Sequence, residues 1–191
     1  MASGKGPSKA LIVGVILVVA MLLIGLWVVL AYNTAVSQEQ SVNSGLSQIK
    51  NRFTTKVSIL GPLLVQVDGY KVYESSLLTN ITALRSQWYD VVNGTDTNAM
   101  INVGSALDSQ FVNIRATWEN YPVLSADSIV RAYMGQVVDQ EEQLSYARLQ
   151  YNNAVNSFNS HIKSFPMFLL ADSFGFHEKS YWGNESNALT L

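Results

Sequence analysis

Residues 10–32 read ALIVGVILVVAMLLIGLWVVLAY, a run of 23 residues with no charged side chain. As an α-helix this run would be about 34 Å long at ~1.5 Å per residue, and the hydrocarbon core of a bilayer is about 30 Å thick. Trp27 and Tyr32 stand near its end, as aromatic residues do where a helix leaves the lipid. The run therefore predicts a single transmembrane helix.

Two alternatives to such an anchor are a cleaved signal peptide and a buried helix of a soluble protein. Lys5 and Lys9 resemble the basic start of a signal peptide, and Val29-Leu30-Ala31 resembles a cleavage site. Signal cores are about 7–15 residues long, however, so the length of this run favours an uncleaved anchor. A buried helix of this length without one polar interruption is also disfavoured.

The charges that flank the run predict its orientation. Lys5 and Lys9 precede it, whereas Glu39 follows it and the next basic residue is Lys50. Because basic residues near a span stay on the cytoplasmic side, we expect a single-pass cell-membrane protein. Its N-terminus would lie in the cytoplasm and the larger part of the chain outside.

The rest of the chain is weakly acidic and contains no cysteine. Ten of the twelve basic residues and all fourteen acidic residues follow residue 32, which leaves that part with a net charge of −4. This balance argues against a phosphate-binding surface and so against a nucleic-acid partner. The lack of cysteine excludes disulfides, thiolate metal sites and cysteine nucleophiles.

Beyond residue 32, apolar residues recur at steps of three and four, the spacing of one helix face. Four such stripes follow one another: Val42, Leu46, Ile49, Phe53, Val57 and Leu60; Leu63, Val67, Tyr70, Leu77, Ile81, Leu84 and Trp88; Met100, Leu107, Phe111, Ile114, Trp118 and Tyr121; and Val130, Tyr133, Val137, Leu144, Ala147, Tyr151, Val155, Phe158 and Ile162. No stretch shows the sustained period of two that marks a strand. The pattern predicts an all-α fold in which the transmembrane helix continues into an elongated antiparallel bundle.

Helix-breaking residues separate the stripes. Gly61-Pro62 is expected to end or kink the first helix and to open the second. The cluster at 93–97 predicts a turn, with Thr97 as a helix cap, and Tyr121-Pro122 is expected to stop the third helix. The fourth helix is expected to be capped by Ser125 or Asp127 and to end at Phe165-Pro166.

These boundaries divide the chain into four parts. We expect a short cytoplasmic tail at 1–9, a transmembrane helix at 10–32, a helical bundle at 33–182 and a flexible tail at 183–191. The fourth helix would be about 37 residues or roughly 55 Å long, and it needs long antiparallel partners.

A series of short motifs follows the run in a fixed order. In the first half they are Tyr32-Asn33-Thr34-Ala35-Val36; Gln48-Ile49 with Lys56 and Ile59-Leu60-Gly61-Pro62-Leu63; and Gly69-Tyr70 with Glu74 and Arg85. In the second half they are Glu119-Asn120-Tyr121-Pro122-Val123-Leu124; Glu141 with Ala147-Arg148 and Tyr151-Asn152; Phe158-Asn159; Phe165-Pro166; and Phe174-Gly175-Phe176.

In this order and at these spacings, the motifs resemble those of the LemA family over almost the full chain. The resemblance implies a membrane-anchored, all-helical bundle, and the family carries no established catalytic activity. Thr55 stands where that family has the first of two arginines, Tyr73 replaces its histidine, and the proline is displaced by one position.

The residues form no recognisable catalytic or metal-binding motif. His161 and His177 are 16 residues apart on different predicted elements, without the ligand spacing of a zinc site. No G-x-S-x-G elbow marks a hydrolase nucleophile. We therefore expect no enzymatic activity, no metal and no cofactor, and we interpret His161 as a boundary residue of the long helix.

Glu74 is the most informative polar residue, because it lies in register with an apolar stripe. It comes four residues after Tyr70 and three before Leu77. Burial of an unpaired carboxylate is costly, so we expect a structural ion pair with Arg148 of the long helix or Arg85 of the same helix. A ligand-binding or proton-binding role is the alternative.

Two further groups of polar residues are expected at the surface. The possible N-glycosylation sites are Asn80, Asn93 and Asn184, although three sequons are about what this composition gives by chance. The chain also has an acidic cluster, Asp139, Glu141 and Glu142. We expect this cluster to form a solvated face rather than a cation site.

The apolar segment at 165–182 has two interpretations. Its aromatic side chains are expected in the core, and the alternative is that the segment packs back toward the lipid interface or against a partner.

The sequence predicts a membrane-anchored, non-enzymatic helical scaffold or interaction protein. Its expected partners are the lipid bilayer and either other membrane proteins or a second copy, so that it self-associates or serves as an accessory subunit of a membrane complex. The alternative is a ligand-binding or sensor exodomain that acts through a membrane partner.

Overall fold

The computed structural model describes residues 8–68, 75–94, 96–120, 122 and 126–183. Within them the chain forms four long α-helices and no strand: α1 (Lys9–Asp68), α2 (Ser75–Val92), α3 (Thr97–Asn120) and α5 (Ser128–Lys163). Two short 3-10 helices follow α5, namely η1 (Met167–Leu169) and η2 (Asp172–Phe174). The predicted all-α fold is confirmed.

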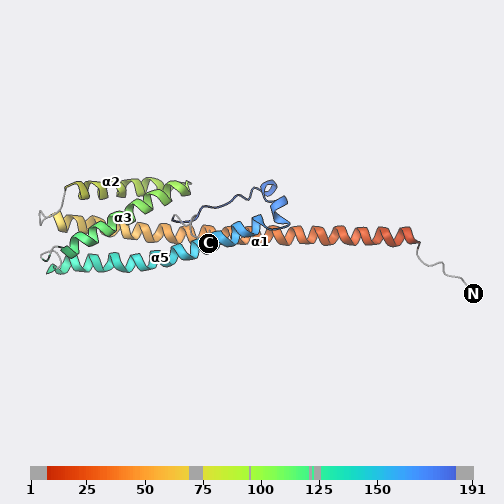
Figure 1. Cartoon of the computed structure of the whole chain (residues 1–191), viewed down its shortest axis with the longest axis horizontal. Helices are drawn as coiled ribbons and strands as arrows, with labels where there is room; N and C mark the ends of the chain where they lie inside the picture. The colour runs from red at the N-terminus through yellow and green to blue at the C-terminus, as the bar shows by residue number, and fades with distance from the viewer. Residues whose placement is uncertain (1–7, 69–74, 95, 121, 123–125, 184–191) are drawn as a thin grey trace, which may run out of the picture.

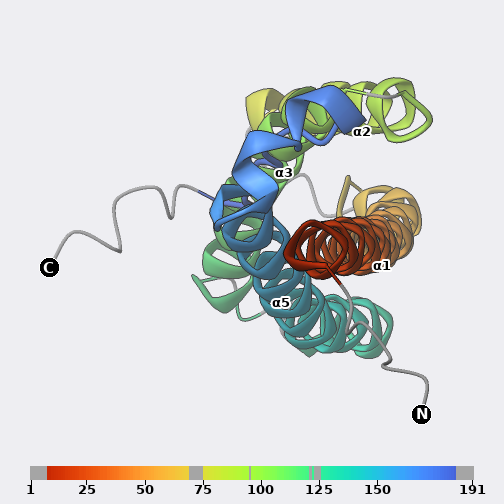
Figure 2. The same cartoon turned by 90° about the vertical axis from the view of Figure 1, so that its right-hand side faces the viewer.

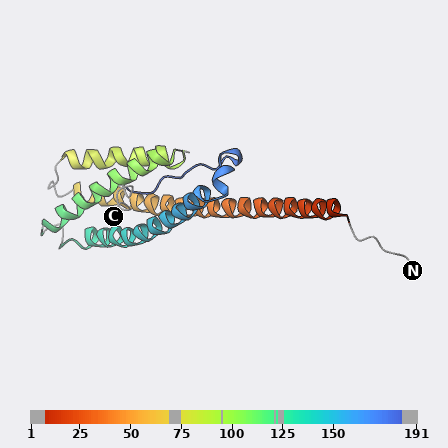
Figure 3. The same ribbon diagram turned by 45° about the vertical axis from the view of Figure 1, so that its right-hand side comes forward.

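The helices run up and down along one axis (Figure 1). α1 and α5 lie side by side and antiparallel, and they form the most extensive helix–helix contact of the described chain (Figures 1 and 3). α2 and α3 form an antiparallel pair, and α3 crosses the bundle obliquely from the side of α2 toward α5 (Figures 1 and 2). The result is the elongated antiparallel bundle that the stripes predict.

One predicted boundary is wrong, because α1 passes through Gly61-Pro62 and ends at Asp68. Pro62 has no N–H and removes one helical hydrogen bond. Leu60 and Leu63 flank it and are both fully buried, so their packing in the core offsets that loss. The second predicted stripe is therefore divided between the end of α1 and α2.

The start and the end of α5 agree with the sequence. Asp127 caps the helix, and its Oδ1 accepts hydrogen bonds from the N–H groups of Ile129 at 2.7 Å and Val130 at 3.0 Å. Ser125, the other predicted cap, lies outside the described residues. The helix has 36 residues and ends before Phe165-Pro166.

The cap of α3 differs from the prediction by one residue. Thr97 is the first helical residue, and the capping acceptor is Asp96, whose Oδ1 receives the N–H of Ala99 at 3.0 Å. An aspartate serves as well as a threonine at this position, since both supply an oxygen to an unpaired N–H group.

The core contains the predicted stripes. Its fully buried members include Val42, Ile49, Phe53, Val57 and Leu60 of α1; Ile81 and Trp88 of α2; Met100, Leu107, Phe111 and Ile114 of α3; and Val130, Val137, Leu144, Ala147, Tyr151, Val155, Phe158 and Ile162 of α5. The four helices thus bury one apolar face each against the others.

The first third of α1 has no such cover. Every large apolar side chain from Leu11 to Trp27 is exposed, and the first fully buried residue of the helix is Ala35. This part projects alone from the end of the bundle (Figure 1). It is the one helix of the described chain that is long and apolar enough to cross a membrane. Its full exposure argues against a buried helix of a soluble protein.

After α5 the chain turns back along the bundle, and two asparagines of α5 hold it there. Asn159 donates to the carbonyl of Lys179 and accepts from its N–H, both at 2.9 Å. Asn152 makes the same pair of bonds with Trp182, at 3.0 and 2.8 Å. Each amide thus pairs with a backbone residue as a neighbouring strand would, which fixes the returning segment on the bundle.

Candidate functional site

Lys56 of α1 is fully buried, and among the described residues it is the one basic side chain in the core. It projects from the same face of the helix as Phe53, Val57 and Leu60, which are also buried. A buried ammonium group is stable only with close partners of opposite charge.

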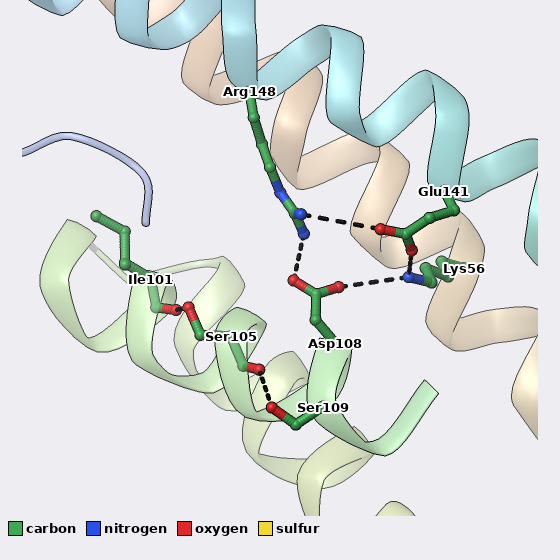
Figure 4. A network of polar contacts seen from close by, with 7 residues as sticks. All are labelled: Lys56, Ile101, Ser105, Asp108, Ser109, Glu141 and Arg148. Atoms are coloured by element: carbon green, nitrogen blue, oxygen red, sulfur yellow. Dashed lines mark hydrogen bonds and ion pairs between the residues drawn. The ribbon is translucent and has the colours of Figure 1, made fainter. Parts of the chain in front are cut away.

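Three charged side chains from two other helices surround Lys56 (Figure 4). Its Nζ lies 3.3 Å from Oδ1 of Asp108 on α3 and also donates to Oε2 of Glu141 on α5. Arg148 of α5 donates to Oδ2 of Asp108, and its Nη1 lies 3.9 Å from Oε1 of Glu141. We call Lys56, Asp108, Glu141 and Arg148 the charge cluster.

Aromatic rings cover the two cations of the charge cluster. Lys56 Nζ lies 3.8 Å from the centre of the Phe111 ring, and Arg148 Cζ lies 5.1 Å from that of Phe53. The negative face of each ring attracts the cation that lies over it.

The charge cluster contains two positive and two negative groups. Burial raises the pKa of Asp108, since desolvation disfavours its charged form, and the nearby Arg148 and Lys56 offset part of this effect. The two negative charges balance the two positive ones, and they supply the buried Lys56 with partners of opposite charge.

The geometry of the charge cluster fits a structural role. Lys56 has no exposed surface, so it cannot reach a substrate in solution. Three of the four ion pairs join two different helices, and the fourth, between Arg148 and Glu141, lies within α5. Together the pairs fix α1, α3 and α5 in one register. A slip of any helix by one turn would separate buried charges, which is strongly unfavourable.

The predicted ion pair of Glu74 remains a prediction, because Glu74 lies outside the described residues. Arg148, one proposed partner, pairs with Asp108 and Glu141. Arg85, the other, packs over Gly61, and its Nε is buried without an acceptor among the described residues. The structure therefore places the two arginines in separate surroundings.

Sequence reasoning missed Lys56 and Asp108, although a signal was present. Lys56 comes three residues after Phe53, and Asp108 three before Phe111, so both lie in register with their stripes as Glu74 does. Glu141 was expected on a solvated face, and its side chain is half exposed while its oxygens turn toward Lys56 and Arg148.

The histidines and sequons lie at or near the surface. His161 is half buried at the end of α5, where its Nε2 lies 3.1 Å from the carbonyl oxygen of Ala31. His177, Asn80 and Asn93 are exposed, and Asn184 lies outside the described residues. In the described part of the chain, no group of three or more His, Asp or Glu side chains is placed to hold a metal.

A polar groove of about 890 Å³ runs between α1 and α5. Its lining contains no charged residue and consists of Ser37, Gln38, Gln40, Ser41, Ser44, Gly45, Gln48, Tyr146, Gln150, Asn153, Ala154 and Ser157. Oε1 of Gln38 is buried there without a hydrogen-bond donor among the described residues. The groove begins a few residues beyond the apolar run, so it lies close to the predicted membrane surface.

Comparisons with known proteins agree with this architecture. A model of the LemA family matches residues 45–190. The chain is 24% identical over 133 residues to Protein LemA of Metamycoplasma hominis, a match that covers 70% of this chain and 60% of that protein. The chain thus spans less than two thirds of that relative.

The chain is also similar to Magnetosome protein MamQ 1 and Magnetosome protein MamQ 2 of Paramagnetospirillum magneticum. Each is 23% identical over 202 residues, a match that covers 94% of this chain and 74% of the relative. Together with the exposed apolar helix, these relatives indicate a membrane-associated helical protein.

Proposed function

We propose that this protein is a membrane-anchored, non-enzymatic scaffold. The chain belongs to the LemA family, and it carries an exposed apolar helix long enough to cross a membrane. In this proposal the bundle associates with a second copy of itself through the polar groove. The observation that carries the proposal is the lining of that groove, which is polar, uncharged and close to the anchor.

The side chains of the groove suit association of two identical faces. Glutamine, asparagine and serine each offer a donor and an acceptor, so a face that carries them can pair with its own copy. A charged face would repel its copy, and this lining contains no charge.

Because the anchor holds the copies in one membrane, a weak interaction between two grooves is sufficient for them to form a dimer. Two copies in one membrane share the same orientation, and the lipid confines them to a thin layer, which raises their effective concentration. A two-fold axis along the membrane normal would then bring the grooves of two copies face to face.

Disulfide crosslinking in native membranes tests this proposal. The chain has no cysteine, so a single introduced cysteine reports one position. Ser44 lines the groove, whereas the neighbouring Asn43 is exposed and does not line it. We expect mild oxidation to convert Ser44→Cys into a covalent dimer and to leave Asn43→Cys a monomer.

Equal crosslinking of the two variants, or a monomer by native mass after detergent extraction, would contradict self-association. A product of S44C with the mass of one chain plus another protein would instead make this chain an accessory subunit. A monomer whose groove is protected only when a small ligand is added would favour the alternative of a ligand-binding or sensor exodomain.

A further inference from the structure

The turn that follows α5 exposes three large apolar side chains. Phe165 is 78% exposed, Phe168 54% and Leu169 61%. We call these three residues the exposed turn. A soluble protein seldom leaves such a group in water, and here it stands at the end of the bundle where α1 emerges alone (Figures 1 and 3).

The exposed turn is held in place by its own neighbours. Met167 and Ala171 point inward and are fully buried, so the residues between and beside them must face outward. The end of α5 is tied to α1 by the contact between His161 Nε2 and the carbonyl oxygen of Ala31 at 3.1 Å. The exposure of Phe165, Phe168 and Leu169 is therefore a fixed feature of the fold.

The exposed turn is continuous with the apolar surface of α1. The ring of Phe165 lies 6.2 Å from that of Trp27 and 6.4 Å from that of Phe168. Further along, the ring of Tyr32 lies 5.2 Å from that of Phe174. One apolar surface thus runs from the predicted span onto the end of the bundle.

The level of the exposed turn along α1 matches the edge of the lipid. Trp27 lies about 26 Å along the helix from Ala10 and Tyr32 about 33 Å, at ~1.5 Å per residue, whereas the hydrocarbon core is about 30 Å thick. If α1 spans from residue 10, the lipid edge falls between Trp27 and Tyr32. Phe165, which contacts Trp27, lies at the same level.

The charged residues around the exposed turn do not favour binding to anionic lipids. Lys163 is paired with Glu178 at 2.8 Å, and Asp172 is fully exposed beside His177. Attraction to anionic headgroups would need unpaired basic residues at this edge. Insertion here must depend on the apolar side chains.

We propose that Phe165, Phe168 and Leu169 insert into the interface of the same bilayer that α1 crosses, as a second lipid contact of the bundle. This inference rests on the proposed membrane anchoring. It commits to lipid as the occupant of the exposed turn, and it fixes the rotation of the bundle about α1, so that one side of the bundle always faces the membrane.

Depth-dependent fluorescence quenching tests the inference on the full chain in vesicles of phosphatidylcholine. Single cysteines replace Phe168, Val18 within the predicted span, or Val112, an exposed apolar residue of α3. α3 lies along the bundle, away from the part of α1 that projects alone (Figure 1). Each carries the same environment-sensitive dye, and nitroxide lipids place the quencher near the headgroup or deep in the chains. We expect Phe168→Cys to lose most of its fluorescence to the shallow quencher, Val18→Cys to the deep quencher, and Val112→Cys to neither.

The outcomes separate this inference from the anchor itself. If V18C is quenched while F168C stays as bright as V112C, α1 spans the membrane but the inference is wrong. If V18C is not quenched either, the membrane anchor fails and both proposals fall. If F168C is quenched only when the vesicles contain anionic lipid, the contact depends on charge, and insertion by the apolar side chains is contradicted.

Protein cover of the exposed turn is also distinguishable. Shielding of F168C from aqueous iodide without quenching by nitroxide lipid would mean that a partner or a second copy covers it, which contradicts the inference. Leu169→Cys provides a second labelling site, and circular dichroism of each variant confirms that the helices are retained.

Discussion

Lys56 places a full positive charge in the core of a bundle whose other core positions are nearly all apolar. Desolvation of an ion costs several kcal/mol, and the ion pairs with Asp108 and Glu141 return much of it. A hydrophobic residue in its place would pack without that cost. The use of charges thus favours one register of the helices over alternatives rather than maximal stability.

Replacement of Lys56 by Met should therefore destabilise the bundle by about 3 kcal/mol, because it leaves two carboxylates facing one arginine. The further change Asp108→Asn restores the balance of charges, so it should cost less in that background than alone, or even stabilise. Denaturant unfolding of the three variants in detergent measures this coupling. Lys163→Met is the matched control, since Lys163 is more than half exposed in its pair with Glu178, and it should change stability by less than about 1 kcal/mol.

Tyr151 gives a prediction at alkaline pH. Its hydroxyl donates to the carbonyl of Ser180 at 2.7 Å, and burial raises its pKa from 10.0 to about 12. Between these two values the unfolded chain loses the proton and the folded chain keeps it, so the free energy of unfolding falls by about 1.4 kcal/mol per pH unit. The contribution is fully present below pH 10 and is lost as the pH approaches 12.

Unfolding midpoints of the protein and of Tyr151→Phe across this range test the effect. The variant should be less stable at neutral pH, since it lacks the hydrogen bond to Ser180, but its stability should fall less steeply above pH 10. Identical slopes for the two proteins would contradict the raised pKa.

Among the helices, α3 meets the returning C-terminal segment at Gly104. A Cβ atom at Gly104 would lie 2.7 Å from Cζ2 of Trp182, which is buried and held by Asn152. This close approach fixes the segment against α3 as well as α5. Gly135 of α5, by contrast, has no atom within 4 Å of such a Cβ.

The same substitution at the two glycines should therefore have opposite effects. Gly135→Ala should stabilise α5 by about 0.5–1 kcal/mol, because alanine favours the helix. Gly104→Ala gains the same helix propensity but must displace the Trp182 ring, so we expect a net loss of stability and a change in tryptophan fluorescence. Stabilisation by both changes would show that the Trp182 contact is loose.

The sequence was sufficient for the helices but not for their tertiary contacts. Apolar spacing, Asp127 and Phe165-Pro166 predicted the core faces and the bounds of α5, since these depend on local residues. Pro62 was misinterpreted because burial of Leu60 and Leu63 overrides its local effect. The partners of Lys56 and Arg148 depend on how three helices are rotated about their axes, which spacing along one chain does not determine.

For the molecule as a whole, the flanking lysines predict that the bundle lies outside the cell membrane. A membrane-impermeant maleimide applied to intact cells should label Ser58→Cys, an exposed position of the bundle, but not Ser3→Cys in the predicted tail. Lysis should make both reactive. Labelling of S3C alone in intact cells would show the opposite orientation, with the N-terminus outside and the bundle in the cytoplasm.

The unbroken course of α1 has a mechanical consequence. Its 36 residues beyond Tyr32 extend about 54 Å, and they continue the anchor without a joint. A change of tilt by about 20°, within the range of single-pass helices, would swing the far tip sideways by about 18 Å. Because the helix is continuous, a change in bilayer thickness that alters the tilt of its lipid-embedded part also displaces the distal end of the bundle.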